Sequence, residues 1–149
     1  MRLKGEHAFV FIHDGNPQNG APYNEHDRRM RDDEFEDFLL SCKGWHVVKE
    51  TSAITRTFQF DRHALAYEWM GRVMGFAYMA DKFPRVVWMG SRVDVTVYSG
   101  RFKGLSVREA RLAAFMSDQA FLIRTADQQR KQLVHGSPTD GLQQTNPLE

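Results

Sequence analysis

The sequence predicts one α+β domain, in which a four-stranded, mainly antiparallel sheet carries three helices on one face. Three observations lead to this prediction. Three segments repeat apolar residues at helical spacing, and two pairs of short segments between them have the composition or alternation of strands. The resulting order is α-β-β-α-β-β-α, and a length of 149 residues suits a single domain.

Residues 1–27 are interpreted as an N-terminal extension of this domain. The apolar stretch 8–12 suits a strand or a docked segment, and the run 14–22 that follows is rich in turn residues. The first helix comes next and ends near Gly44, which can adopt the left-handed cap conformation. Its apolar stripe, spaced i, i+3, i+4 and i+7, consists of Phe35, Phe38, Leu39 and Cys42.

The four strands are predicted at residues 45–49, 54–60, 85–89 and 92–99. In the second strand, Ile54, Phe58 and Phe60 share one face. The fourth strand alternates valine with other residues from Val93 to Val97, which predicts one buried face.

The second helix is predicted to run from Asp61, its cap, to about Lys82, with Pro84 as the stop. Its main stripe consists of Leu65, Trp69, Val73, Phe76 and Ala80. The other side is also largely apolar, through Met70, Met74, Tyr78 and Met79. A helix that is apolar on both sides is expected to be covered on both.

The last helix has a clear start signal, because Ser106 and Glu109 have the spacing of a capping box. Its buried stripe is predicted to consist of Leu112, Met116, Ala120 and Ile123. From residue 125 the sequence is polar and then rich in Gly, Pro, Gln and Asn, so a disordered tail is expected over residues 125–149. The domain itself is therefore placed at residues 28–124.

Composition excludes several classes of function. The 20 basic and 19 acidic residues nearly cancel, which gives no support for nucleic acid or an anionic membrane as the main partner. There is no apolar run of membrane-spanning length, and the first residues lack the apolar core of a signal peptide. Cys42 is the single cysteine, and the six histidines form no metal-binding motif, so no disulfide, metal or other cofactor is expected. A cytoplasmic location is the prediction.

Several short motifs together resemble the pterin-4a-carbinolamine dehydratases. They extend over most of the domain and need no gaps. The matching residues are Gly44-Trp45, the alternating Ile54, Arg56, Phe58 and Phe60, then Ala66, Arg72-Val73, Pro84, Gly104-Leu105-Ser106 and Leu112-Ala113. This resemblance implies the family's α+β fold.

The resemblance does not extend to the family's catalytic histidines. The family has a His-His pair directly before the proline, where this chain has Lys82 and Phe83, and a third histidine where it has Gly100. The acidic residue of the last helix is kept in type as Glu109, so Glu109 and Gly100 are expected to mark a vestigial pocket. Histidine suits the two proton transfers of the dehydration because its pKa is about 6.5. We therefore expect no catalytic residues and no dehydratase activity; the alternative is a divergent dehydratase that uses Glu109, Tyr98 or Lys82.

A scaffold without its catalytic groups is expected to bind protein. Basic residues beside aromatic ones are typical anchors of interfaces, although an ordinary solvated face explains the basic residues equally well. The candidates are Lys82, Phe83, Arg85, Trp88, Arg101 and Phe102. The chain resembles the branch of the family that serves as RuBisCO assembly factors, or chaperones, in α-carboxysome carbon fixation, which implies the RuBisCO large subunit as partner. A dimerisation cofactor of a transcription regulator is a further alternative.

A homodimer is also expected. The family resemblance places the strand at residues 92–99 at an edge of the sheet. An exposed valine-rich edge would pair with a second copy across a two-fold axis.

Overall fold

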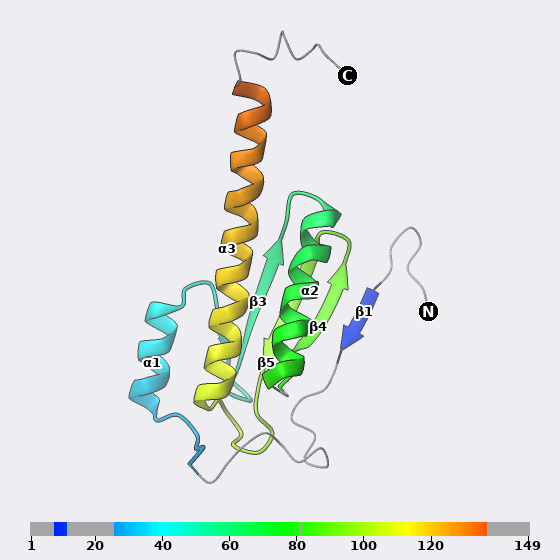
Figure 1. Ribbon diagram of the computed structural model, residues 1–149. Coiled ribbons are helices and arrows are strands. Elements are labelled where there is room, and N and C mark those ends of the chain that lie inside the picture. The colour runs from blue at the N-terminus through cyan, green and yellow to red at the C-terminus, as the bar shows by residue number, and fades with distance from the viewer. Residues whose placement is uncertain (1–7, 12–25, 81, 137–149) are drawn as a thin grey trace.

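The computed structural model describes residues 8–11, 26–80 and 82–136 (Figure 1). The elements in chain order are β1 (Ala8–Phe11), α1 (Asp32–Ser41), β2 (His46–Val48), β3 (Ala53–Gln59), α2 (His63–Ala80), β4 (Arg85–Met89), β5 (Arg92–Val97) and α3 (Val107–Gly136). The turn-rich run expected at residues 14–22 and the end of the chain, residues 137–149, lie outside the described residues. Among the described residues, no helix has both the length and the hydropathy to cross a bilayer.

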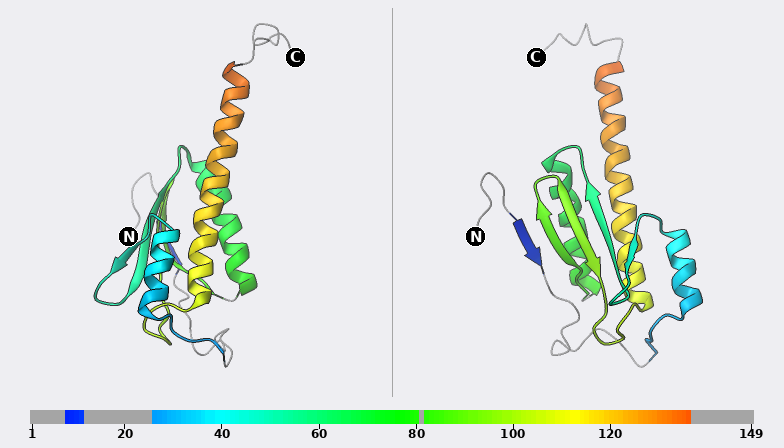
Figure 2. Two further views of the ribbon diagram at one scale, coloured as in Figure 1. Left: turned by 90° about the vertical axis from the view of Figure 1, so that its left-hand side faces the viewer. Right: turned by 180° about the vertical axis from the view of Figure 1, so that it is seen from behind.

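The predicted α+β architecture is confirmed. Strands β2, β3, β4 and β5 form the expected antiparallel sheet, and the three helices lie on one of its faces (Figure 2). The N-terminal segment adds β1 as a fifth strand, which pairs with β4 from Ala8 opposite Met89 to Phe11 opposite Val86. The full strand order is β1-β4-β5-β3-β2.

The expected position of the last strand was wrong. β5 lies between β4 and β3, and the edges of the sheet are β1 and β2. The physical reason is visible in β5 itself: Val93, Val95 and Val97 are buried beneath the helices, and both neighbouring strands pair with its backbone. A homodimer cannot form by strand addition to β5.

The core lies between the sheet and the two longer helices. The ring centroids of Phe58 on β3 and Trp69 on α2 are 4.7 Å apart, and the indole N–H of Trp69 donates to the Met116 carbonyl of α3 at 2.9 Å. The predicted stripe of α3 is buried as expected. The expectation that α2 is covered on both sides was wrong for this single chain, because Tyr78 and Met79 are 75% and 82% exposed.

The start of α3 confirms the capping box. The backbone N–H of Ser106 donates to Glu109 Oε1 at 2.7 Å, and the Ser106 hydroxyl accepts from the backbone N–H of Arg108 at 3.1 Å. The expected end of the helix was wrong, because α3 continues through residues 125–136 and passes beyond the end of the sheet (Figure 1).

An ionic cluster accounts for the extra length of α3. The carboxylate of Asp127 is buried and pairs with Arg62 at the start of α2, and with Arg130 and Lys131 one turn further along α3. Lys131 also reaches Asp61, at 3.0 Å. The charged residues that suggested a solvated tail therefore connect this part of α3 to the two residues that precede α2.

Candidate functional site

The six predicted binding residues do not lie on one surface. Successive side chains of a strand point to opposite faces, and in β4 this places Arg85 on the face without helices. Trp88 lies on the helix side, where its ring stacks on His63 with centroids 5.7 Å apart. Arg101 and Phe102 belong to the loop between β5 and α3, where the guanidinium carbon of Arg101 lies 5.8 Å from the Phe102 ring centroid.

Lys82 is not a surface residue. Its side chain is buried and its ammonium lies 3.0 Å from Glu109 Oε2. The other carboxylate oxygen, Oε1, accepts from the backbone and the hydroxyl of Ser106. Glu109 is thus both a member of the capping box of α3 and the buried partner of Lys82, which lies two residues after the end of α2. Glu109 and Gly100 were expected to mark a vestigial pocket. Glu109 lines neither of the two cavities described below, and Gly100 lies exposed in the loop after β5.

The face of the sheet without helices carries a cavity of about 170 Å³, which we call the sheet-face pocket. The β2–β3 turn and the start of β3 form one wall, and the starting residues of β4 lie opposite the end of β5. The alternation that buries the valines of β5 places Thr96 on the opposite face, where it lines the pocket together with Tyr98, which directly follows β5. Its lining consists of Thr51, Ala53, Phe83, Arg85, Thr96 and Tyr98.

The lining of the sheet-face pocket is suited to binding. Phe83 and Tyr98 supply aromatic surface, and Arg85 supplies an exposed guanidinium. Within the described part of the chain, that guanidinium has no hydrogen-bond or ion-pair partner. None of the six lining residues is His, Cys, Asp, Glu or Lys. The pocket can therefore take an apolar group together with an anion, but its lining holds no side chain whose usual pKa lies near neutrality.

Sequence reasoning identified two of these six residues as binding candidates, Phe83 and Arg85, and considered Tyr98 only as an alternative catalyst. The alternation of β5 could have placed Thr96 and Tyr98 on the same face. No pattern indicated that the β2–β3 turn would contribute Thr51. Among the described residues, no group of three or more His, Cys, Asp or Glu side chains could hold a metal ion.

Fold and site together define a small α+β domain with helices on one face of the sheet and a pocket on the other. The sequence profile of the family described as pterin 4 alpha carbinolamine dehydratase matches residues 28–119. The chain belongs to this family.

Individual relatives agree with this assignment. A protein of Novosphingobium aromaticivorans, which carries the provisional name pterin-4-alpha-carbinolamine dehydratase, is 33% identical over 88 residues, 59% of this chain and 92% of that protein. A Brucella ovis protein with the same provisional name is 28% identical over 89 residues, 60% of this chain and 92% of its own length. A crystal structure of a transcriptional coactivator/pterin dehydratase from Brucella melitensis superposes with a TM-score of 0.60 at 28% identity and covers 62% of this chain and 99% of that one.

Proposed function

We propose that this chain is a non-catalytic member of the family that binds another protein through the sheet-face pocket. The lining of the pocket carries this proposal. Phe83 stands where the family has a histidine, and the five other lining residues offer no replacement for it. Lys82, at the neighbouring histidine position, is held in a buried ion pair with Glu109. The dehydration requires groups that gain and lose protons near neutral pH, and the pocket offers aromatic surface and a guanidinium instead.

The pocket also defines what a partner must present. A volume of about 170 Å³ accommodates one large side chain, and a buried aromatic contact next to an arginine is the usual composition of an energetic anchor. The partner protein should therefore insert an apolar side chain against Phe83 and Tyr98 and place a carboxylate against Arg85. Because Arg85 is exposed, the association should weaken as salt is raised.

The partner we propose to test first is the RuBisCO large subunit. The support for it is the sequence resemblance to α-carboxysome assembly factors, together with a site that binds without chemistry. The experiment is co-expression of large and small RuBisCO subunits with and without this protein, with the yield of assembled holoenzyme as readout. An increased yield that is lost in Phe83→Ala and in Arg85→Glu supports the proposal. Arg111→Glu, an exposed charge reversal on α3, is the matched control and should keep the gain.

Three outcomes would contradict parts of this proposal. An unchanged yield without a complex on pull-down of the large subunit removes RuBisCO as the partner. A gain that survives Arg85→Glu places the contact surface outside the pocket. A direct dehydratase assay beside a homologue with all three histidines tests the non-catalytic assignment, which fails if the activity is within about tenfold of that homologue.

A transcription regulator is the second candidate partner. The observation that favours it is the similarity to the Brucella melitensis structure, because that protein is described as a transcriptional coactivator. The variants Phe83→Ala and Arg85→Glu show in a pull-down whether a regulator binds at the sheet-face pocket. A regulator that is retained by the wild-type protein and lost with Phe83→Ala would occupy that pocket. The control is again Arg111→Glu.

We also propose that the protein forms a homodimer, with α2 and not β5 at the interface. The support is the exposed apolar side chains of α2, because Tyr67 is 67% exposed and Tyr78 and Met79, about three turns further along, are still more exposed. An isologous contact would bury the same face of both copies. Light scattering at micromolar concentration should give the mass of a dimer, and Met79→Glu should give a folded monomer whose melting temperature does not depend on protein concentration. A monomeric wild-type protein would rule the dimer out.

A further inference from the structure

The segment between residues 28 and 34 contains three arginines and three carboxylates, and most of them pair with one another. The ion pairs are Arg28 with Glu34 at 2.8 Å, and Arg31 with Asp33 at 3.4 Å and with Glu34 at 3.3 Å. The other two charges, Arg29 and Asp32, have no hydrogen-bonding or ionic side-chain partner in the described part of the chain, and they do not pair with each other. These two residues line the same cavity.

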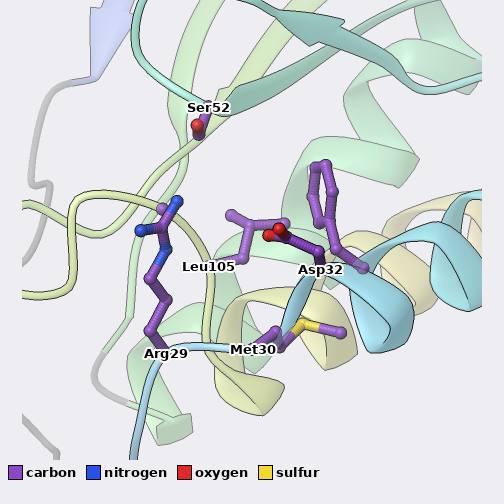
Figure 3. A pocket seen from close by; sticks show the side chains of 7 residues that line it. Arg29, Met30, Asp32, Ser52 and Leu105 are labelled. Carbon is purple, nitrogen blue, oxygen red and sulfur yellow. The ribbon is translucent and has the colours of Figure 1, made fainter.

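This cavity, which we call the α1 cavity, is small and has fixed walls. Its volume is about 60 Å³, and its lining consists of Arg29, Met30, Asp32, Phe35, Ser52, Gly104 and Leu105. The guanidinium of Arg29 and the carboxylate of Asp32 face the same space from opposite sides, below Ser52 (Figure 3). The backbone N–H of Met30 donates to the Leu105 carbonyl at 2.8 Å, which joins the start of α1 to the loop before α3.

Gly104 allows Arg29 to take this position. A Cβ atom on residue 104 would lie 2.7 Å from Arg29 Nε, closer than non-bonded atoms approach. Any larger residue at 104 would therefore displace the guanidinium. The position of the positive charge over the cavity depends on this glycine.

The charges and the size of the cavity restrict its ligand. A simple anion would be attracted by Arg29 and repelled by Asp32. A simple cation would be repelled by Arg29 and attracted by Asp32. A ligand with a carboxylate and an ammonium group would satisfy both, through charge-assisted hydrogen bonds. Because one water needs about 10–15 Å³ of such a cavity, 60 Å³ holds only a few heavy atoms. We propose that the α1 cavity binds a small zwitterion of the α-amino acid class, with its carboxylate on Arg29 and its ammonium group on Asp32.

The apolar part of the lining limits the side chain of this ligand. Met30, Phe35 and Leu105 present hydrocarbon and no charge. A hydrogen or a methyl group as side chain fits these neighbours and the volume, so glycine and alanine are the probes of choice. The sheet-face pocket shares none of the lining residues, so the proposed function and this site can fail independently.

The test is a titration of the full-length protein, with the backbone amide resonances of Ser52 and Gly104 as readout. Alanine at concentrations up to about 10 mM should shift these resonances saturably. Sodium acetate and methylammonium chloride, which each carry one of the two charges, should not do so at the same concentration and ionic strength. No saturable shift with either glycine or alanine, or an equal shift with acetate or methylammonium, would overturn the proposal.

Variants show whether the two charges act as proposed. Arg29→Gln and Asp32→Asn should each weaken alanine binding about tenfold or more, the effect of losing one hydrogen bond to a charged group. Gly104→Ala should weaken it by displacing Arg29, and Arg111→Gln, an exposed arginine elsewhere, should leave it unchanged. Both charged residues are exposed, so the melting temperature should stay the same in the first two variants. Undiminished binding by Arg29→Gln would refute the assignment.

Discussion

Replacement of Lys82 by methionine tests the buried ion pair between Lys82 and Glu109. The side chains of Lys82 and Glu109 are 4% and 2% exposed and their charged atoms are 3.0 Å apart. Methionine keeps most of the aliphatic stem but leaves the carboxylate without its cation. Removal of one partner from a buried ion pair costs about 3–5 kcal/mol. Since Ser106 still donates twice to Glu109 Oε1, the lower end of this range, about 3 kcal/mol, is expected.

The assay is urea denaturation followed by the fluorescence of the buried tryptophans Trp45 and Trp69. A loss of about 3 kcal/mol lowers the midpoint by about 1–3 M at the usual dependence on urea. Arg85→Met, which removes an exposed positive charge nearby, is the control and should change the midpoint little.

A double-variant cycle separates the ion pair from the packing of the lysine stem. Glu109→Gln keeps an acceptor for Ser106 and removes the charge, so Lys82→Met combined with Glu109→Gln should cost less than the sum of the two single changes. The difference expected for residues in contact is about 0.5–3 kcal/mol. A loss below about 1 kcal/mol for Lys82→Met, or strict additivity in the cycle, would refute the buried pair.

Three further predictions concern stability and association. Ser117→Ala removes the acceptor of the Trp45 indole and of the Arg56 guanidinium, each at 2.9 Å, and should cost about 1–3 kcal/mol in urea denaturation, whereas a neutral effect would mean that water replaces the hydroxyl. The hydrogen bond from Arg28 lowers the pKa of Glu34 to about 2, so this carboxylate stabilises the fold above its ordinary pKa of 4.5, and the stabilisation is lost as the pH falls towards 2. Glu34→Gln should therefore lower the melting temperature at pH 7 but not at pH 2, and equal differences at both values would contradict this. A truncation that removes β1 should expose the edge of β4 and raise the mass measured by light scattering, and an unchanged mass would show that β1 does not protect that edge.

The elements of the fold were predictable because each leaves a local pattern. The capping box of Ser106 and Glu109 marked the start of α3, and the alternating valines marked β5. The order of the strands was not predictable in this way, because the period of a strand says which face is buried but not which strands lie beside it. The continuation of α3 was missed because Asp127 pairs with Arg62, a residue that directly precedes α2 and is distant in the sequence.

The site shows the same division between local and distant contacts. Phe83 and Arg85 are two residues apart and line the same pocket, as extended chain geometry would suggest. Trp88 is an odd number of positions from both, so alternation alone could have assigned it to the other face. Lys82 was expected on the surface because lysine is rarely buried without a partner, and its partner Glu109 lies on another element, where no local pattern could indicate it.

The sequence pattern of α2 predicted two covered sides, but the single chain covers only one of them fully. A helix that is apolar all round is normally buried on all sides, and a partner can cover a side that the chain itself leaves exposed. In the single chain, the sheet and α3 bury the side that contains Trp69 and Val73, while Tyr78 and Met79 stay in solvent. Exposed apolar side chains that form a contiguous patch often mark an interaction site. The exposed end of α2 and the sheet-face pocket are therefore where the proposed dimer and the proposed partner would bind, one on each side of the sheet.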